Sequence, residues 1–198
     1  MEKMTIRKAL LEQRESISEI NRGEKSKAIS ALIHDSESYK KAKNIFCFIS
    51  VSSEPDTSEI IKVALSSGKT ICVPRTKSEH IMEAVPITET EYKAVSDWPH
   101  RFGIPEPPDS IKPIDPLELD LVVVPSIATD IFGYRLGYGG GYYDAFINKY
   151  QIECKRPTLV AILFSEFLLE EALPREAHDK SVDFIVTEND IIIPFSCA

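Results

Sequence analysis

Arg135-Leu136-Gly137-Tyr138-Gly139-Gly140-Gly141-Tyr142-Tyr143-Asp144 is the stretch around which this chain is organised. Five of the eight glycines lie between residues 133 and 144, after an apolar run at 121–125 and before a helix-like stretch at 142–150. Glycine has no Cβ and adopts positive φ, so such a turn lets backbone N–H groups approach a ligand closely. A helix that starts after the turn adds unpaired N–H donors, which suit a phosphate group.

The side chains around these glycines favour the same chemistry. Arg135 supplies a cation whose planar fork matches phosphate oxygens, and Asp144 could hold a magnesium ion that bridges to them. The alternative is a tight turn on which aromatic side chains pack, since glycine is the usual turn residue. The stretch is neither a Walker phosphate loop, which ends in Gly-Lys-Ser/Thr, nor a dinucleotide fingerprint after a first strand.

Composition excludes several classes of protein. The 198 residues are 43% hydrophobic and 27% charged, which is ordinary for a globular domain with its own core. A net charge of −8 argues against a nucleic-acid partner, which would require a basic face. No apolar stretch approaches the ~20 residues of a membrane span, and the charged N-terminus has no signal-peptide core. A cytoplasmic location without membrane contact is therefore expected.

The four cysteines, Cys47, Cys72, Cys154 and Cys197, show no C-x-x-C spacing. Two of them, Cys47 and Cys72, lie inside apolar strand-like runs. We expect reduced thiols that serve as small apolar residues.

Hydrophobic periodicity predicts an α/β protein. The expected helices are 3–15, 18–34, 58–67, 142–150 and a short one at 165–169, and the expected strands are 44–51, 70–74, 81–87, 120–125, 158–163, 182–187 and 190–194. The proline-rich segment 97–115 is expected to be a surface loop, with Trp98 and Phe102 either pinned to the core or lining a cleft. The strand–helix–strand unit at 44–74 implies a right-handed crossover. We therefore expect a single domain over residues 1–198, a mostly parallel sheet flanked by helices.

The predicted strand ends indicate where a ligand would bind. In open α/β sheets, ligands bind beyond the carboxyl ends of the strands. Glu54, Arg75 and the 133–144 loop all follow such ends, whereas Asp179 precedes the 182–187 strand. On the first helix, Lys3 and Arg7 lie four residues apart on one side, with Arg14 two turns further along. A solvated basic face is the alternative for these cations, as a solvated loop acid is for Glu54 or Asp179.

Residues 135–144 closely resemble the signature of the 5-formyltetrahydrofolate cyclo-ligase family, Arg-Leu-Gly-x-Gly-x-Gly-Tyr-Tyr-Asp. The similarity extends from residue 3 to about residue 187. Its further matches are Lys3-x-x-x-Arg7, the apolar run 48–51 followed by Glu54, Pro74-Arg75, Gly103-Ile104-Pro105-Glu106-Pro107, His178-Asp179, Val182-Asp183 and Thr187. The resemblance also implies a fold like that of the NagB/RpiA/CoA transferase group.

This resemblance implies ATP- and Mg²⁺-dependent cyclisation of 5-formyltetrahydrofolate to 5,10-methenyltetrahydrofolate. ADP and phosphate would be released, and the formyl oxygen would be phosphorylated on the way. The implied enzyme is a monomeric ligase that acts on the mono- or polyglutamylated substrate.

The same resemblance implies a role for each matching residue. The implied ATP-binding residues are Lys3, Arg7, Arg135, Leu136, Gly137, Tyr138, Gly139, Gly140, Gly141, Tyr142 and Tyr143, with Lys3 and Arg135 as the catalytic cations. The implied folate-binding residues are Ile49, Glu54, Tyr138, Gly139, Gly140, Gly141 and Tyr142. Asp144 and Asp179 would hold the magnesium ion.

One departure and two rival functions accompany this interpretation. Many family members have a basic residue in the glycine loop, where this chain has Tyr138 and Gly140, so charge neutralisation falls to Arg135, Lys3, Arg7, the backbone and the metal. A non-catalytic nucleotide- or folate-binding protein is one rival, which retention of Glu54 and the two aspartates disfavours. A sugar-phosphate or CoA-handling enzyme is the other, and it rests on fold analogy alone.

Overall fold

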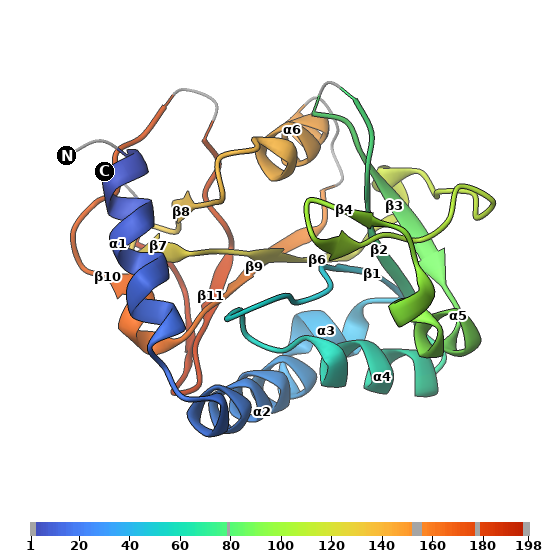
Figure 1. Cartoon of the computed structure of the whole chain (residues 1–198), viewed down its shortest axis with the longest axis horizontal. Helices are drawn as coiled ribbons and strands as arrows, with labels where there is room; N and C mark the ends of the chain where they lie inside the picture. Colours follow the sequence, from blue (N-terminus) through green and yellow to red (C-terminus); the bar gives the residue numbers. More distant parts are fainter. Residues whose placement is uncertain (1–2, 79, 152–155, 177–178, 196–198) are drawn as a thin grey trace.

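A seven-stranded sheet in the order β12-β11-β9-β6-β1-β2-β3 forms the centre of the molecule (Figure 1). The computed structural model of the chain describes residues 3–78, 80–151, 156–176 and 179–195. The five inner strands run parallel, whereas the outer strands β12 and β3 pair antiparallel with their neighbours. The strands are β1 (Asn44–Cys47), β2 (Thr70–Thr76), β3 (Met82–Ile87), β6 (Leu121–Pro125), β9 (Thr158–Ile162), β11 (Phe184–Val186) and β12 (Ile191–Ile192).

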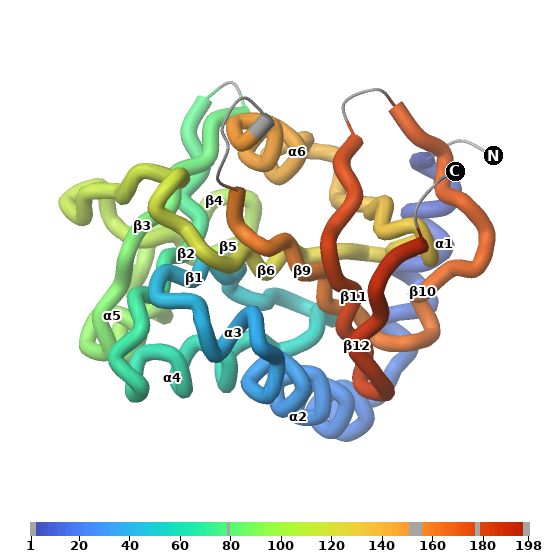
Figure 2. Tube along the Cα trace, turned by 180° about the vertical axis from the view of Figure 1, so that it is seen from behind, coloured from blue at the N-terminus to red at the C-terminus, as the bar shows by residue number. Residues whose placement is uncertain are grey.

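Helices cover both faces of this sheet (Figures 1 and 2). One face carries α2 (Glu19–Asp35), α3 (Glu37–Lys41) and α4 (Ser58–Ser66), and the other carries α6 (Tyr142–Asn148). The helix α5 (Glu89–Lys93) lies beside α4 at the β3 edge. All five residues of β6 are buried, as expected for a central strand with apolar neighbours on both faces.

The core is continuous from one helical layer to the other. On the α6 side, the rings of Phe46 and Phe146 stack with centroids 4.8 Å apart. On the α4 side, Ile60 and Ile61 are fully buried. Both layers bury apolar side chains against the same strands. A shift in the register of a strand would therefore remove these side chains from their contacts in one of the two layers.

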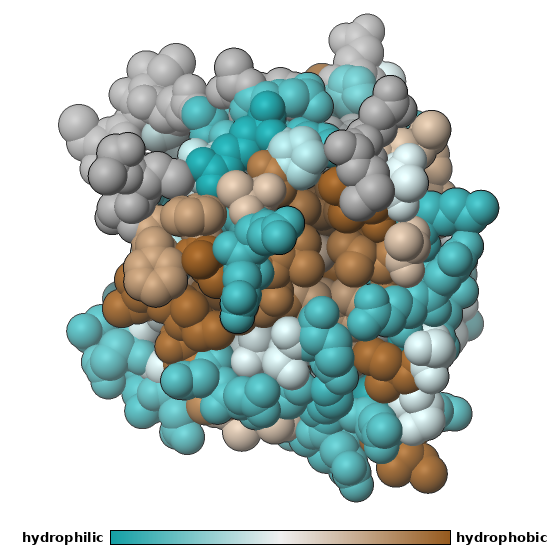
Figure 3. Space-filling view, turned by 90° about the vertical axis from the view of Figure 1, so that its left-hand side faces the viewer, coloured by the Kyte–Doolittle hydropathy of each residue, from teal (hydrophilic) through white to brown (hydrophobic). Residues whose placement is uncertain are grey.

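Two small sheets and one more helix complete the structure. The strands β7 (Ala128–Asp130), β8 (Arg135–Leu136) and β10 (Leu168–Leu169) form one sheet, and β4 (His100–Arg101) and β5 (Ile104–Pro105) form a hairpin. Helix α1 (Lys3–Glu15) lies alongside the first of these sheets, and apolar surface gathers in the middle of the face on that side (Figure 3). The 3₁₀ turns are η1 (Val95–Asp97), η2 (Pro116–Glu118), η3 (Lys149–Gln151) and η4 (Ser165–Phe167).

All the predicted strands and all but one of the predicted helices exist, whereas α3, α5 and the β4–β5 hairpin were not predicted. The strand expected at 44–51 ends at Cys47. The helix expected at 165–169 is wrong: a single 3₁₀ turn is followed by β10, whose backbone pairs with β7. The β7–β8 hairpin was not predicted, because its strands are only three and two residues long.

A side chain of the preceding loop binds the first backbone N–H of α4. The Thr57 hydroxyl does not cap the helix but donates to Phe48 O, and the carboxylate of Asp56 accepts the Ser58 N–H instead. The two aromatic residues of the proline-rich segment divide between the expected roles, since Trp98 is buried in the core and Phe102 lines a cavity.

Two expectations concern membranes and cysteines. Within the described ranges, none of the helices is both long and apolar enough to cross a membrane. Cys47 and Cys72 are buried free thiols, as expected, whereas Cys154 and Cys197 lie outside the described residues.

Truncating the stacked pair should destabilise the protein strongly. Phe146→Ala removes a fully buried ring and leaves a cavity against Phe46, so we expect the free energy of unfolding to fall by about 3–5 kcal/mol. Urea unfolding followed by circular dichroism measures this loss. Met4→Ala, at a side chain that is 69% exposed, is the control and should change it by less than about 0.5 kcal/mol. Equal losses would mean that the stacked pair is not part of the cooperative core.

Candidate functional site

A cavity of about 330 Å³ opens at the carboxyl ends of β1, β2 and β6. Its walls come from the strand ends (Phe48, Ile49, Pro74, Thr76, Pro125), from the glycine loop and the start of α6 (Gly137, Tyr138, Gly140, Tyr142, Tyr143), and from the β4–β5 hairpin (Phe102, Ile104, Glu106). Four charged side chains line it, namely Glu54, Glu106, Arg135 and Asp144. The cavity thus lies where ligands bind in open α/β sheets.

The glycine loop has a backbone conformation that requires glycine. Gly139 and Gly141 have φ values of 95° and 66°, which side-chain-bearing residues rarely adopt. Two side chains hold the loop from outside: Arg7 Nε donates to Gly137 O at 2.7 Å, and His80 Nδ1 lies 2.7 Å from Gly140 O, close enough to donate to it. Sequence reasoning placed Arg7 here but missed His80, which reaches the loop from the β2–β3 connection.

Arg135 and Asp144 form a partly buried ion pair. The Arg135 side chain is 3% exposed, and its Nη2 donates to Asp144 Oδ1 at 2.7 Å. Burial lowers the pKa of Arg135, and the charges of Asp144 and Asp179 oppose that shift. Among the described residues, Arg135 Nε and the Tyr143 hydroxyl are buried without a hydrogen-bond partner. Two donors of the site are therefore still available to a ligand.

Lys3 and Asp179 are also brought together. Lys3 Nζ lies 2.7 Å from Asp179 Oδ2 and 3.1 Å from Glu176 Oε1, which ties α1 to the segment before β11. Although burial lowers the pKa of Lys3, its hydrogen bonds to these two carboxylates give a net rise. Among the described residues, no three His, Cys, Asp or Glu side chains form a ready-made metal site. His178, which precedes Asp179, lies outside those residues.

Glu54 lies deep in the cavity wall, with only 8% of its surface exposed. Its Oε1 accepts a hydrogen bond from the Tyr138 hydroxyl and its Oε2 accepts one from Val51 N at 2.9 Å. Burial raises the pKa of Glu54, and these two hydrogen bonds and the charge of Arg14 oppose the rise. Arg14 was noted on the basic side of the first helix but was not expected to reach this site.

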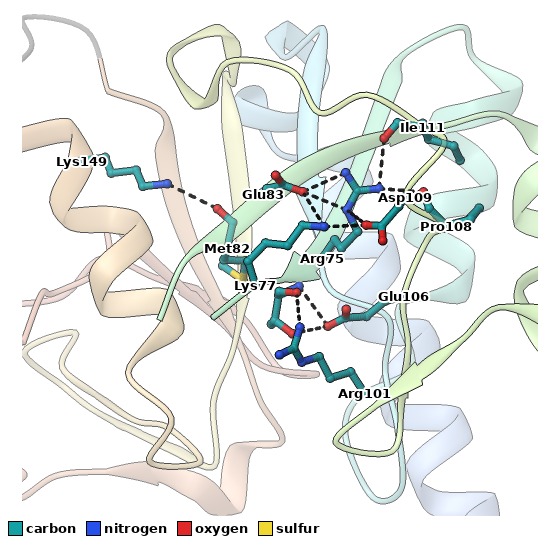
Figure 4. A network of polar contacts seen from close by, with 11 residues as sticks. Arg75, Lys77, Met82, Glu83, Arg101, Glu106, Pro108, Asp109, Ile111 and Lys149 are labelled. Carbon is teal, nitrogen blue, oxygen red and sulfur yellow. Dashed lines mark hydrogen bonds and ion pairs between the residues drawn. The ribbon is translucent and has the colours of Figure 1, made fainter. Parts of the chain in front are cut away.

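The expectation that Arg75 joins this site is wrong. Arg75 Nε donates to Glu83 Oε2 at 2.9 Å and its Nη1 donates to the carbonyls of Pro108 and Ile111, so the side chain anchors the proline-rich segment (Figure 4). It lines a separate cavity of about 280 Å³. Side chains alternate along a strand, and Arg75 is directed away from the face to which its neighbours Pro74 and Thr76 contribute.

The sequence can now be compared with known proteins. A profile of the 5-formyltetrahydrofolate cyclo-ligase family matches residues 1–188. The chain belongs to this family. A probable 5-formyltetrahydrofolate cyclo-ligase of Schizosaccharomyces pombe is 30% identical over 165 residues, which cover 78% of this chain and 79% of the yeast protein. The 5-formyltetrahydrofolate cyclo-ligase of Saccharomyces cerevisiae is 32% identical over 180 residues, which cover 81% of each chain.

The fold agrees with that of a solved cyclo-ligase relative. The NMR structure of Aquifex aeolicus 5,10-methenyltetrahydrofolate synthetase superposes with a TM-score of 0.81 at 26% identity, covering all of this chain and 95% of the other. Membership of the cyclo-ligase family, a mostly parallel α/β fold and the enzyme class of a ligase are therefore confirmed as the sequence predicted.

Because Asp144 pairs with Arg135, replacing it should lower the stability of the protein even when no metal is bound. In Asp144→Asn, the buried Arg135 loses its counter-charge, so the free energy of unfolding measured in EDTA should fall by about 1–3 kcal/mol. Thermal and urea unfolding measure this change. Asp109→Asn is the matched control, because Asp109 is 82% exposed and its pair with Lys77 should contribute less than about 1 kcal/mol. An unchanged stability for Asp144→Asn would mean that the pair is incidental.

Proposed function

We propose that this chain catalyses the ATP- and Mg²⁺-dependent cyclisation of 5-formyltetrahydrofolate to 5,10-methenyltetrahydrofolate, with release of ADP and phosphate. The observation that carries the proposal is a single cavity lined by two different kinds of polar group. Glu54 offers a buried carboxylate acceptor, and Arg135, Asp144 and the glycine loop offer a cation, a metal-binding acid and close backbone approach. A folate and a nucleotide can share such a cavity.

The chemistry explains why no nucleophilic side chain is required. The oxygen of the N5-formyl group is a poor leaving group, so N10 cannot displace it directly. Transfer of the γ-phosphoryl group to that oxygen gives an iminium phosphate and releases ADP. N10 then attacks the activated carbon and loses its proton, the ring closes, and phosphate departs with the former formyl oxygen. Phosphoryl transfer requires positioning and charge neutralisation rather than a protein nucleophile.

The proposed nucleotide half consists of cations and the glycine loop. Arg135 Nε and the Tyr143 hydroxyl are buried donors with no partner among the described residues, which fits a phosphate ligand. Helix α6 has only seven residues, so phosphate binding is assigned to the loop and the cations rather than to the helix end. The full proposed set is Lys3, Arg7, Arg135, Leu136, Gly137, Tyr138, Gly139, Gly140, Gly141, Tyr142 and Tyr143, with Lys3 and Arg135 as the catalytic cations.

The proposed metal ligands are Asp144 and Asp179, two hard oxygen donors of the type that Mg²⁺ prefers. The charges of both act on Arg135, which supports their placement near one another. When bound, Mg²⁺ would neutralise phosphate charge. Asp144 accepts a hydrogen bond from Arg135 and Asp179 accepts one from Lys3, so both carboxylates lie beside the cations proposed to bind phosphate.

The proposed folate half consists of the apolar wall and Glu54. Phe48, Ile49 and Tyr142 offer flat or apolar surface to a pterin, and Glu54 offers lone pairs to its adjacent N–H donors. We assign Ile49, Glu54, Tyr138, Gly139, Gly140, Gly141 and Tyr142 to this half. We further propose that the chain acts as a single-domain monomer in the cytoplasm, on substrate with one or several glutamates.

Turnover should depend strictly on a nucleoside triphosphate and a divalent metal. Formation of methenyltetrahydrofolate from 5-formyltetrahydrofolate, followed by its absorbance, should fall to background without ATP or in excess EDTA, and added Mg²⁺ should restore it. The reason is that γ-phosphoryl charge must be neutralised during transfer. A normal rate in EDTA would rule out the metal-dependent mechanism. Binding of both ligands without turnover would favour the rival of a non-catalytic binding protein.

Glu54→Gln should weaken folate binding selectively. The substitution keeps the shape but replaces an acceptor by a donor, so one pterin N–H would face an unpaired partner at a cost of about 1–3 kcal/mol. That cost corresponds to a loss of about 5- to 150-fold in affinity. Calorimetric titration with each ligand separately tests it, and ATP affinity should hardly change. Glu12→Gln, at a side chain 67% exposed, is the control. A selective loss of ATP affinity would show that the two halves are assigned the wrong way round.

A further inference from the structure

Arg14 on helix α1 is a buried cation with three polar contacts. It is 2% exposed, and it donates from Nε to Ser53 Oγ at 3.1 Å, from Nη1 to Ser126 O at 3.3 Å and from Nη2 to the Tyr138 hydroxyl at 2.6 Å. These acceptors lie after β1, after β6 and in the glycine loop. One guanidinium thus connects three of the segments that form the cavity.

A buried cation is costly unless a negative group compensates it. Among the described residues, no carboxylate lies within 4 Å of Arg14. Four other arginines there have a direct carboxylate partner, namely Arg75, Arg135, Arg156 and Arg175. The Tyr138 hydroxyl lies between Arg14 and Glu54, and the charge of Arg14 acts on that carboxyl group. The positive charge of Arg14 is therefore linked to the Glu54 carboxylate by two hydrogen bonds through the Tyr138 hydroxyl.

The hydroxyl has a defined direction in this chain of hydrogen bonds. A phenol has one proton to donate. Because Arg14 can only donate, the Tyr138 oxygen accepts from it and directs its own proton to Glu54 Oε1. The guanidinium also lies 5.6 Å from the Tyr138 ring centroid, within the range of a cation–π contact. Both contacts stabilise this position of the ring, although Tyr138 as a whole is 47% exposed.

We propose that Arg14 is a positioning residue that acts through Tyr138 to hold the Glu54 carboxylate in the orientation that receives the substrate. This inference rests on the proposed function, because it assumes that Glu54 binds the folate. Val51 N and the Tyr138 hydroxyl occupy one lone-pair site on each carboxylate oxygen. The remaining lone pairs belong to a group that lines the cavity, where a pterin would donate to them.

A double-mutant cycle distinguishes this role from general support of the fold. The affinity for 5-formyltetrahydrofolate is measured by calorimetry without nucleotide for the wild type, Tyr138→Phe, Glu54→Gln and the double variant. We expect Tyr138→Phe to bind about 3- to 10-fold more weakly, since it removes only the hydroxyl. In the Glu54→Gln background the same change should have less than about a 2-fold effect, because the coupled partner is already altered.

Tyr150→Phe is the matched control. It likewise removes a single phenol hydroxyl. Tyr150 is buried and its hydroxyl donates to Pro116 O at 2.9 Å, but Tyr150 does not line the cavity. Its folate affinity should equal that of the wild type.

Arg14→Lys tests the cation itself. Lysine keeps the charge but cannot form the same three-way fork, so folate affinity should fall about 3- to 10-fold. That loss should disappear in the Tyr138→Phe background if Arg14 acts through the hydroxyl. Additive losses, or an unchanged affinity in Tyr138→Phe, would overturn the inference even if the wild type turns over normally. Failure of the wild type to bind 5-formyltetrahydrofolate would instead reject the proposed function, and the inference with it.

Discussion

Parallel pairing of β1 with β2 and β6 is the constraint on which the rest of the structure depends. Parallel strands need crossover connections, and helices α4 and α6 provide them between β1 and β2 and between β6 and β9. The same geometry brings every carboxyl end to one edge. The loop after β1, the end of β2 and the glycine loop after β6 therefore meet there, although they are far apart in the sequence.

Burial of charge decides how that edge is organised. Arg135 pairs with Asp144, Lys3 with Asp179, and Glu54 with the Tyr138 hydroxyl, since each would be costly to bury alone. The groups proposed to bind ligands are thus already held in place by one another. A ligand would exchange partners with them rather than order free side chains, which lowers the entropic cost of binding.

Helix α1 has a larger part in the site than its position at the start of the chain suggests. It brings Lys3 to Asp179, Arg7 to the glycine loop and Arg14 to Tyr138, so three basic residues on one helix reach three parts of the cavity region. The family resemblance led us to expect a basic residue in the glycine loop, where this chain has Tyr138 and Gly140. Positive charge reaches that position from Arg14, across the phenol.

The sequence alone determined the long elements and the family, because apolar runs such as 121–125 and the motif at 135–144 are local features. It also placed Glu54 and the glycine loop at one edge, since strand direction follows from a crossover. Only the tertiary structure decided which charges pair. The direction of the Arg75 side chain, the contact of His80 with Gly140 and the link from Arg14 to Glu54 depend on segments 60 or more residues apart, or on which face of a strand a side chain occupies. No local sequence pattern encodes these contacts. The partner of a polar side chain depends on which segments are buried beside it in the fold, and not on its residue type alone.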